Sequence, residues 1–486
     1  MTPLDWSFLS RVIASLRENP RGEQGAPHAM SRFTRSSPMP VSRQDLAHWH
    51  MRDGALQRML PPWEEVDVVK APVPMVDGAT AEFILQRGLL PIRWVARHEQ
   101  VDPATGFVDL QVRGPFRRWR HQHRFEERGA TSAITDDIQY ELPVPPVGPI
   151  VAGWVVRAHL ERAFRFRHRR LSNDLHRHRE CAGLAGLRVG ITGASGLVGR
   201  QLQAFLTTGG TSVKRLTRGS ASASRGEIQW NPRGERVATA PFESLDAIVH
   251  LAGANLADER WTPERMVVLR ESRVAATRHL CTLLAGLERK PRVLVCMSGV
   301  GLYGTDHDRS VDERDPSGRD FIAQLALDWE AAAQPAIDAG IRVVFLRAGM
   351  VVTAAGGAVA KMRTPFLFGA GGPIGSGRQG ISWIAADDLL GMIATAIVDE
   401  RWTGPVNAVA PEAVEQRHFA KVLGRSLRRP AIAPMPAAVV KMLFGDMGES
   451  LLLRGQFAQP TRATELGFRW DFPRLHDALD FELGRA

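Results

Sequence analysis

The segment Leu187–Gly199, LRVGITGASGLVG, constrains the fold of this chain more than any other segment of its length. A β-type apolar run ends at Thr192, glycines follow at Gly193, Gly196 and Gly199, and a helical pattern comes next. In such a strand–turn–helix unit the first glycine permits a tight turn, the second lets the backbone approach a pyrophosphate, and the third lets the helix pack closely. Helix N-terminal N–H groups favour the phosphates. The segment predicts a dinucleotide-binding turn, with a packing turn in another α/β fold as the alternative. The predicted contacts are Thr192, Gly193, Ala194, Ser195, Gly196, Leu197, Val198 and Gly199.

Strand-like and helical patterns alternate from this turn to residue 407. Because a chain of 486 residues is too long for one ordinary core, two or three domains are expected. Alternating strands and helices imply right-handed βαβ units, so residues 187–407 are predicted to form a Rossmann-like, doubly wound parallel α/β sheet. Residues 408–486 are largely helical in pattern and predict a small C-terminal helical domain. The further strands predicted in the sheet are Ser212–Thr217, Ala247–Leu251, Val293–Met297 and Arg342–Leu346.

The N-terminal part predicts a domain of a different class. Residues 1–29 are interpreted as a leader, either disordered or a short amphipathic helix, and Met30 is an alternative translation start. Residues 30–179 contain strand-like runs followed by one basic helix, which predicts an α+β helix-grip domain whose curved sheet wraps that helix. Residues 180–186 are predicted to be a linker. The strand-like runs are Ala81–Leu85, Ile92–Arg97, Gly106–Val112 and Ile134–Leu142.

Two features of this N-terminal region have more than one interpretation. Trp119, His121 and His123 alternate, so they are predicted to share one face of a strand, either as satisfied packing or as ligands and acid–base groups. The basic run Arg157–Arg179 has apolar residues at helical spacing. It predicts a helix on a sheet with a solvated basic face. Binding of nucleic acid or of an anionic surface is the less favoured interpretation, because no RNA-binding motif or zinc-finger spacing accompanies the run.

Composition narrows the function classes further. The formal net charge is +10, and the apolar and charged fractions are those of a globular protein. No apolar run is long enough to predict a membrane span. The three cysteines, Cys181, Cys281 and Cys296, have no metal-ligand spacing, so no metal is predicted and a reduced, cytoplasmic compartment is expected.

The end of the second predicted strand indicates which dinucleotide binds. An acidic side chain at this point would accept hydrogen bonds from both ribose hydroxyls and so select NAD. This chain has Arg218 there instead, with Arg215 nearby. A guanidinium gives paired donors to a 2′-phosphate, so NADP is predicted over NAD, the alternative being an ordinary surface arginine. Leu251, Ala252 and Gly253 follow another apolar strand and are predicted to lie against the adenosine half of the cofactor.

Several phrases resemble a known family. TGASGLVG from Thr192, the strand ending LTR at Arg218 and HLAG from His250 resemble the extended short-chain dehydrogenase/reductase family. SGVGLYG (Ser298–Gly304) and GAGGPIGSGRQGISWIAADDL (Gly369–Leu389) are similar to its atypical epimerase-like, or cell-division-inhibitor-like, branch. The resemblance implies the C-terminal domain of unknown function that this branch carries.

A second resemblance concerns the N-terminal domain. The phrases Gly114–Phe125 and Asp136–Pro143 resemble the START-like, or polyketide-cyclase-like (SRPBCC), ligand-binding superfamily. That resemblance implies an apolar cavity and an apolar ligand.

The resemblance also identifies a departure in the catalytic residues. Active members of the wider family use a tyrosine four residues before a lysine, whereas position 307, four after Tyr303, is a histidine and position 144, four after Tyr140, is a valine. Tyr303 and Ser298 follow a strand end, where parallel sheets bind ligands, and are the predicted catalytic residues, with structural roles as the alternative. Arg273 falls where relatives place a cofactor-side asparagine. Further candidates for the substrate side are Asp387, Asp388 and the glycine-rich segment Gly369–Ser382, which lines a pocket or forms a mobile loop.

Three functions remain open from the sequence. The first is an NADP-dependent oxidoreductase or epimerase-like enzyme with a nonstandard acid and a small-molecule substrate. The second is a non-catalytic NADPH sensor or scaffold, which the missing Tyr–Lys pair favours. The third makes the N-terminal domain a lipid or isoprenoid carrier. The sequence leaves the substrate and the oligomeric state open.

Overall fold

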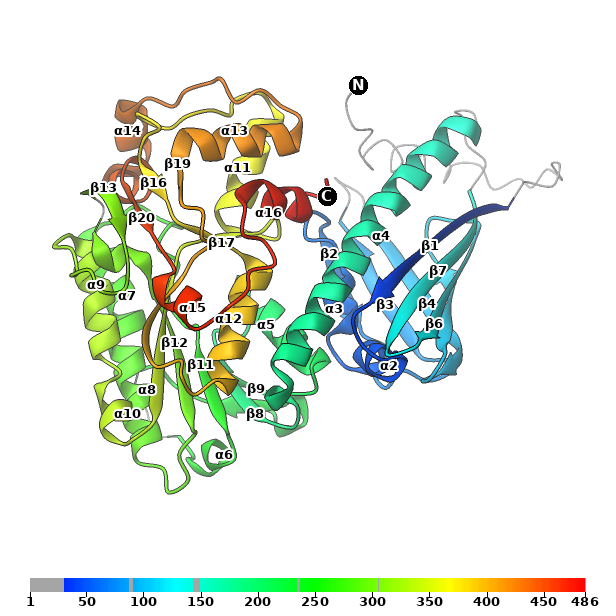
Figure 1. Ribbon diagram of the computed structural model, residues 1–486, viewed down its shortest axis with the longest axis horizontal. Helices are drawn as coiled ribbons and strands as arrows, with labels where there is room; N and C mark the ends of the chain where they lie inside the picture. The colour runs from blue at the N-terminus through cyan, green and yellow to red at the C-terminus, as the bar shows by residue number, and fades with distance from the viewer. Residues whose placement is uncertain (1–29, 87–90, 143–148, 234–236, 305, 486) are drawn as a thin grey trace. The chain divides into compact units, whose positions relative to one another are not determined.

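The computed structural model describes residues 30–86, 91–142, 149–233, 237–304 and 306–485 (Figure 1). The predicted leader, residues 1–29, lies outside them. Two compact units form, and the main boundary falls between Glu180 and Cys181, inside the predicted linker. Unit 1 contains the described residues up to Glu180, Thr207–Gly209, and Gly484 with its described neighbour. Unit 2 contains the described residues of Cys181–Leu206 and Gly210–Leu483.

Unit 1 is built on one antiparallel sheet of seven strands in the order β1-β7-β6-β5-β4-β3-β2. The four predicted strands are present as β3, β4, β5 and β7, and the structure adds β1, β2 and β6. Consecutive strands from β2 to β7 pair with their neighbours, which is the meander expected from short turn-separated runs. The strands are β1 (Ser31–Met39), β2 (Val66–Lys70), β3 (Thr80–Leu85), β4 (Ile92–Asp102), β5 (Gly106–Arg113), β6 (Arg118–Arg128) and β7 (Thr131–Glu141).

The long helix α4 (Pro149–Glu180) supplies the apolar side of this unit's core. Leu160 and Phe164 are buried with side chains of β1 and β7. Leu171 and Leu175 are buried about two and three turns beyond Phe164, beside α2 (Arg43–Met51). The predicted apolar stripe of the basic helix is therefore confirmed, because these residues recur at helical spacing and face the core. A short helix, α3 (Ala55–Met59), precedes β2.

The basic side of α4 differs from the prediction of a solvated face. His168, Arg170 and Arg177 are each less than 5% exposed. Asp174, also on α4, is buried and receives two hydrogen bonds from the guanidinium of Arg58, at 2.8 and 2.5 Å. Arg157, Arg165 and Arg179 are exposed as predicted. The prediction fails for the other residues, because tertiary partners such as Arg58 of α3 cover polar side chains that helical spacing alone assigns to solvent.

Unit 2 is built on a parallel sheet of seven strands in the order β10-β9-β8-β11-β12-β14-β18. The doubly wound, Rossmann-like prediction is confirmed, and all the predicted strands are present. The sheet contains β8 (Arg188–Thr192), β9 (Ser212–Thr217), β10 (Glu227–Gln229), β11 (Ala247–His250), β12 (Val293–Gly299), β14 (Arg342–Ala348) and β18 (Gly404–Ala408).

Helices cover both faces of the parallel sheet (Figure 1). One buried cluster joins α5 (Leu197–Thr208) and α12 (Ala386–Val398) to one face. A second cluster joins α8 (Ala276–Ala285), α9 (Phe321–Ala331) and α10 (Gln334–Asp338) to the other. Neighbouring strand residues alternate between the clusters, because successive side chains of a strand point to opposite faces.

The C-terminal region is largely helical, as predicted, but it is joined to the rest of unit 2 by short strands. β20 (Gly455–Ala458) pairs with β13 (Asp306–Val311), and β19 (Val414–Glu415) pairs with β16 (Gly380–Ile381). The region therefore belongs to the same compact unit as the parallel sheet. Its helices are α13 (Gln416–Leu427), α14 (Ala437–Gly448), α15 (Thr461–Glu465) and α16 (Leu475–Glu482).

The remaining elements connect these parts. Thr262 caps the start of α7 (Pro263–Arg270), where its side chain accepts a hydrogen bond from the N–H of Arg265. Among the described residues no helix has both the length and the apolar character that crossing a lipid bilayer requires. The other short elements of unit 2 are α6 (Ala240–Glu243), α11 (Gly357–Leu367), β15 (Met350–Val352) and β17 (Trp383–Ala385).

Candidate functional site

The glycine-rich turn between β8 and α5 has the geometry that its sequence predicts. Gly193 has a φ of 66°, a conformation that side chains other than glycine rarely adopt. A Cβ atom added at Gly193 would lie 2.8 Å from the carbonyl carbon of Leu251, and one added at Gly199 would lie 2.3 Å from the carbonyl oxygen of Gly193. Glycine is therefore required at both positions for this turn to close.

Thr192 holds the turn in place from inside the protein. Its buried hydroxyl accepts hydrogen bonds from the N–H groups of Leu251 and Ala252, at 3.1 and 3.2 Å, and lies 2.7 Å from Nδ1 of His250. Burial lowers the pKa of His250 to about 4, so its ring is neutral, and Nδ1 accepts the Thr192 proton. The Nε2 proton then goes to Thr277, 2.9 Å away. Thr192 thus positions the binding loops and does not itself line the groove.

A groove of about 1270 Å³ runs along the carboxyl ends of β8, β9 and β11. This edge is where open parallel sheets bind ligands. Of the predicted contacts, the groove does not include Thr192, Leu197, Val198, Gly199 or Arg273. Those that line it are Gly193, Ala194, Ser195, Gly196, Arg218, Leu251, Ala252 and Gly253.

Four arginines line this groove. Arg218 is exposed and makes no hydrogen bond or ion pair with the described residues, whereas Arg215 is paired with Glu227 at 2.9 Å. Arg200, on the first turn of α5, and Arg233 line the same groove. Sequence reasoning missed these two arginines, because neither belongs to a motif. The groove therefore combines a backbone turn suited to a pyrophosphate with guanidinium groups suited to a further phosphate.

Arg273 contacts a binding loop and lies outside the groove lining. It is buried, and its guanidinium donates hydrogen bonds to the carbonyl of Ala254 at 2.9 Å and to that of Leu269 at 3.3 Å. Its guanidinium carbon lies 5.2 Å from the ring centroid of Trp329. Arg273 therefore supports the loop after β11, where the sequence predicted a cofactor contact.

The two predicted catalytic residues lie in a buried polar network. The Tyr303 hydroxyl donates to the side-chain oxygen of Asn407 at 2.7 Å and accepts from Arg347 at 2.9 Å. Arg347 in turn makes a bidentate ion pair with Glu330. Glu330 also accepts a hydrogen bond from the hydroxyl of Ser298 at 2.7 Å. Neither Tyr303 nor Ser298 is among the residues that line the groove. A catalytic role for these two residues stays a prediction.

The surroundings of Tyr303 indicate a structural role. Its side chain is fully buried, and burial raises the pKa of its phenol to about 12 despite Arg347. We expect Tyr303→Phe to bind NADPH as the wild type does. The variant should lose about 1–3 kcal/mol of unfolding free energy, because Arg347 and Asn407 lose a partner. Urea unfolding followed by circular dichroism, beside a cofactor titration, measures both quantities. Loss of NADPH binding without loss of stability would contradict the structural role.

The predicted substrate-side residues are held by contacts within unit 2. The Asp388 carboxylate accepts hydrogen bonds from the N–H groups of Asp471 and Phe472, at 2.7 and 3.1 Å. Within the segment Gly369–Ser382, the side chain of Gln379 donates to the carbonyl of Leu452 at 2.7 Å. Asp388 and this segment therefore fasten the C-terminal region to the rest of the unit, and a role in substrate binding stays a prediction.

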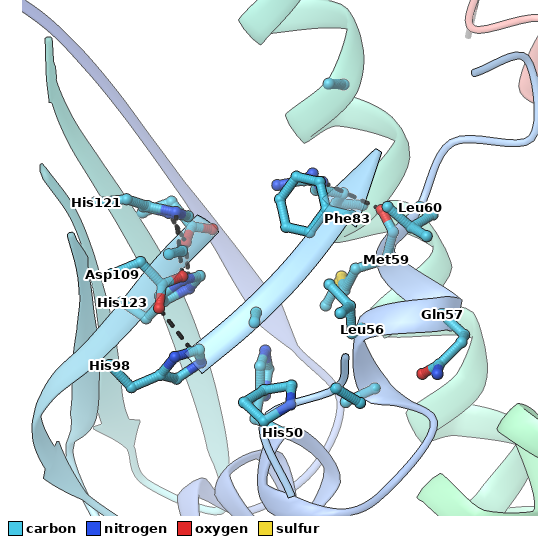
Figure 2. A pocket seen from close by; sticks show the side chains of 18 of the residues that line it. His50, Leu56, Gln57, Met59, Leu60, Phe83, His98, Asp109, His121 and His123 are labelled. Carbon is cyan, nitrogen blue, oxygen red and sulfur yellow. Dashed lines mark hydrogen bonds and ion pairs between the residues drawn. The ribbon is translucent and has the colours of Figure 1, made fainter. Parts of the chain in front are cut away.

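Unit 1 contains a separate, largely apolar cavity of about 220 Å³ (Figure 2). Trp119, His121 and His123 all line it, so the prediction that they share one face of a strand is confirmed. Met59 and Leu60 lie on the side opposite the histidines in Figure 2. The cavity therefore has a cluster of polar side chains on the sheet, and its other walls are largely apolar but include Gln57, Glu64 and Arg167.

Comparison with known proteins places the chain in a family. Residues 189–407 match the model of the NAD dependent epimerase/dehydratase family, and residues 435–481 match a domain of unknown function, DUF1731. The epimerase family protein MT2273 of Mycobacterium tuberculosis is 37% identical over 302 residues, which are 62% of this chain and 99% of that protein. The chain belongs to the epimerase family. Human SDR39U1, another epimerase family protein, is 35% identical over 60% of this chain and 98% of its own length.

Solved structures of this family resemble both units. A nucleoside-diphosphate sugar epimerase from Corynebacterium glutamicum is 31% identical with a TM-score of 0.78, covering 93% of this chain and 90% of that one. Human SDR39U1, solved with NADPH, is 34% identical with a TM-score of 0.56, covering 60% of this chain and 98% of that one. The first likeness covers more of the chain than unit 2 alone, so it extends into unit 1.

Proposed function

We propose that unit 2 binds NADP(H) in the groove beside the glycine-rich turn. The backbone from Gly193 to Gly196 holds the pyrophosphate at the N-terminus of α5, and Arg218 binds the 2′-phosphate. Leu251, Ala252 and Gly253 lie against the adenosine half. The observation that carries this proposal is an exposed Arg218, without a partner among the described residues, on the wall of a groove that the glycine turn forms. The human relative solved with NADPH supports the same choice.

We propose further that the protein is an oxidoreductase or epimerase acting on a small molecule. The cofactor supplies or accepts a hydride when it is bound. The chain's own residues fix its orientation: Thr192 ties the turn to the loop after β11, and Arg273 supports that loop. The ordinary acid pair that the family resemblance implies is missing, because a histidine and a valine stand four residues after the two tyrosines, Tyr303 and Tyr140. The substrate itself therefore has to exchange its proton with another group or with water.

A second candidate function is a non-catalytic NADPH sensor or scaffold. The buried Glu330–Arg347–Tyr303 network favours it, because that network holds its polar groups in protein contacts at the strand ends where an active family member needs an acid. A sensor that binds NADPH without turnover would use the glycine-rich turn and Arg218 to hold the cofactor just as the enzyme would.

Deuterium transfer separates the two functions. We expect the full-length protein, incubated with NADPH deuterated at either face of C4 and a protein-free metabolite extract, to move deuterium from one face into a small molecule. Mass spectrometry detects the labelled product, and a Gly199→Ala variant serves as the control that lacks the cofactor turn. Absence of transfer from either face, with cofactor bound, would reject net reduction by NADPH. It would leave the sensor or an epimerase that returns the hydride to the same substrate molecule.

For the rest of the chain, we propose the division that the sequence predicts. Residues 30–179 form a START-like domain that binds an apolar ligand, 180–186 a linker, 187–407 the NADP-binding domain and 408–486 a C-terminal helical domain. Support for the first comes from the antiparallel sheet, the long helix α4 and the cavity of unit 1. Native mass spectrometry of the full chain tests it, and an empty cavity after purification from cells would count against a bound lipid.

A further inference from the structure

One wall of the unit 1 cavity carries four polar side chains from three neighbouring strands. Asp109 on β5 pairs in register with His121 on β6, and His123 on β6 pairs with Asp136 on β7. Residues directly opposite each other in an antiparallel sheet lie on the same face, and so do alternate residues of one strand. The register therefore gathers two carboxylates and two imidazoles on the face that lines the cavity.

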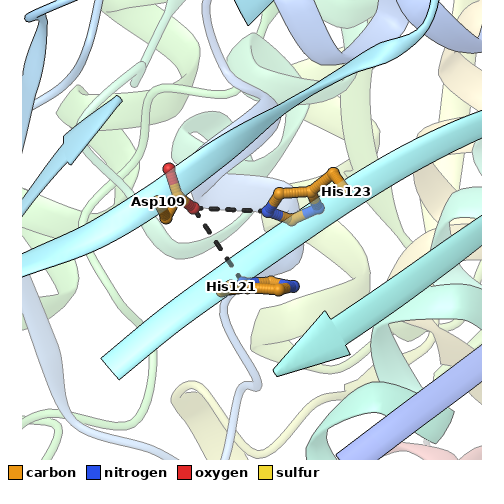
Figure 3. Close-up of side chains that lie close together, drawn as sticks. All are labelled: Asp109, His121 and His123. Carbon is orange, nitrogen blue, oxygen red and sulfur yellow. Dashed lines mark hydrogen bonds and ion pairs between the residues drawn. The ribbon is translucent and has the colours of Figure 1, made fainter. Parts of the chain in front are cut away.

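Three of these side chains point toward a common centre (Figure 3). The ligand atoms of Asp109, His121 and His123 all lie within 4.8 Å of one another. Oδ2 of Asp109 is 3.2 Å from Nε2 of His123 and 4.0 Å from Nδ1 of His121. Atoms bound tetrahedrally to zinc at about 2.1 Å lie roughly 3.4 Å apart, so small side-chain rotations bring these three atoms to coordination distance.

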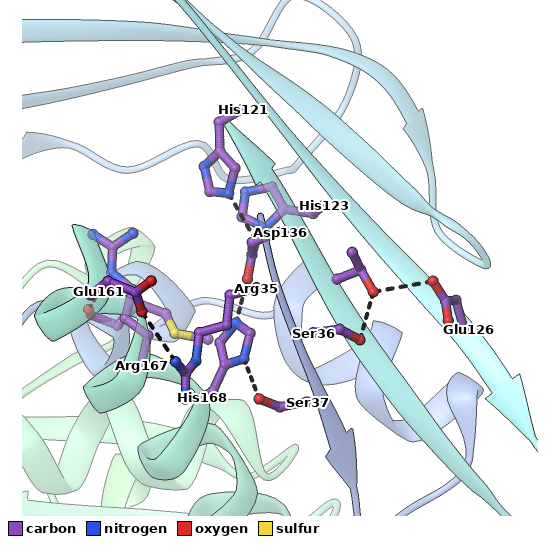
Figure 4. Close-up of polar contacts among 12 residues, drawn as sticks. Arg35, Ser36, Ser37, His121, His123, Glu126, Asp136, Glu161, Arg167 and His168 are labelled. Atoms are coloured by element: carbon purple, nitrogen blue, oxygen red, sulfur yellow. Dashed lines mark hydrogen bonds and ion pairs between the residues drawn. The ribbon is translucent and has the colours of Figure 1, made fainter. Parts of the chain in front are cut away.

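Asp136 lies behind both histidine rings (Figure 4) and is hydrogen-bonded to that of His121. Its Oδ1 lies 2.8 Å from Nε2 of His121 and 2.7 Å from Nδ1 of His123, and its Oδ2 lies 2.6 Å from Nε2 of His168. A carboxylate that accepts the proton of one ring nitrogen leaves the other nitrogen with a lone pair. For His121, whose Nε2 is hydrogen-bonded to Asp136, the nitrogen left in this way is Nδ1, on the side of Asp109. Nδ1 of His123 lies at ion-pair distance from Asp136 without a hydrogen bond to the described residues, and its Nε2 faces Asp109. This is the carboxylate–histidine arrangement that supports metal-ligating histidines.

The carboxylate of Asp109 also has an atom without a hydrogen-bond partner. Its Oδ1 is buried and accepts no hydrogen bond from the described residues, although Nε2 of His98 lies 3.4 Å away. His98 is 4% exposed, and its Nδ1 is buried without a hydrogen-bond partner among the described residues. A buried carboxylate oxygen without a donor is costly unless a cation or a further donor faces it.

We propose that Asp109, His121 and His123 bind one divalent transition-metal ion in unit 1. Two imidazoles and one carboxylate are a ligand set for zinc, or for ferrous iron, that leaves coordination positions open. The open positions face the largely apolar cavity of unit 1, so the expected ligand has one oxygen donor and an apolar body. In the metal-free protein a proton occupies the contact between His123 and Asp109, and the ion displaces it. The site is independent of the cofactor groove of unit 2.

Cobalt(II) titration of the full-length, chelator-treated protein tests the proposal. We expect a visible d–d absorption that saturates at one equivalent per chain, a rise in the melting temperature of unit 1, and displacement of the cobalt by zinc. Metal analysis of protein purified without chelator should find the ion that the cell supplies. No saturating absorption from the wild type would overturn the proposal.

Variants separate this site from incidental binding by other histidines. Asp109→Asn is nearly isosteric and should weaken cobalt binding by about 100-fold, and Asp136→Asn by roughly 10- to 100-fold, because it orients the ligands. His48 is an exposed histidine on α2, so His48→Gln should bind cobalt as the wild type does. Unchanged NADPH binding in every variant shows that unit 2 stays folded. Equal cobalt affinity in Asp109→Asn and His48→Gln would overturn the proposal, even if His121 or His123 variants do not fold.

Discussion

Replacing Gly199 by alanine is expected to weaken NADPH binding by roughly 10- to 100-fold. A Cβ atom at this position would lie 2.3 Å from the carbonyl oxygen of Gly193 and 2.8 Å from Cα of Ala194, and both are backbone atoms. The turn must therefore shift, and overpacking of this kind costs about 1–3 kcal/mol. The shift moves the N–H groups that would hold the pyrophosphate, so the loss falls on binding as well as on stability.

A matched substitution in the same groove separates these effects. Gly219 also lines the groove, but a Cβ atom added there has no atom within 4 Å. Gly219→Ala should therefore bind NADPH as the wild type does. Fluorescence titration of both variants makes the comparison, with urea unfolding as the measure of stability. Equal affinities in the two alanine variants would contradict the role of the turn.

Replacing Arg218 by alanine is expected to remove the preference for NADPH over NADH. Hydrogen bonds to a charged group contribute about 1.5–3 kcal/mol, so the affinity for NADPH should fall roughly 10- to 150-fold. The affinity for NADH should stay unchanged, because NADH has no 2′-phosphate. Folding should also stay unchanged, since Arg218 makes no contact with the described residues that the substitution would remove.

Arg225→Ala is the control for this second experiment. Arg225 is an arginine of the same region whose guanidinium is paired with Glu227 at 3.1 Å and does not line the groove. Titration of wild type, Arg218→Ala and Arg225→Ala with both nucleotides gives the preference ratio of each. A parallel loss of NADPH and NADH affinity in Arg218→Ala would show a general effect on the groove and contradict recognition of the 2′-phosphate.

The fold of unit 2 could be predicted because its signals are local. Glycines at Gly193 and Gly199 mark a turn with few alternatives, and apolar runs separated by helical patterns mark a parallel sheet. The position of Arg218 follows from the end of one strand. Arg200 was missed because a single arginine on the exposed side of a helix has no pattern that distinguishes it from a surface residue.

The site of Tyr303 could not be predicted in the same way. Catalytic residues commonly follow the carboxyl end of a parallel strand. The direction in which such a side chain points, however, depends on residues far away in the sequence that contact it. The hydroxyl of Tyr303 is bound by Asn407, which lies 104 residues further along the chain. In unit 1, the alternation of His121 and His123 was visible, whereas their proximity to Asp109 and Asp136 depends on strand register, which the sequence does not specify.

The central claim is that the groove of unit 2 binds NADP(H), and isothermal titration calorimetry of the full-length wild-type protein tests it most directly. NADPH should bind with saturable heat at one site per chain and more tightly than NADH. Absence of heat with both nucleotides at millimolar concentrations would contradict the claim.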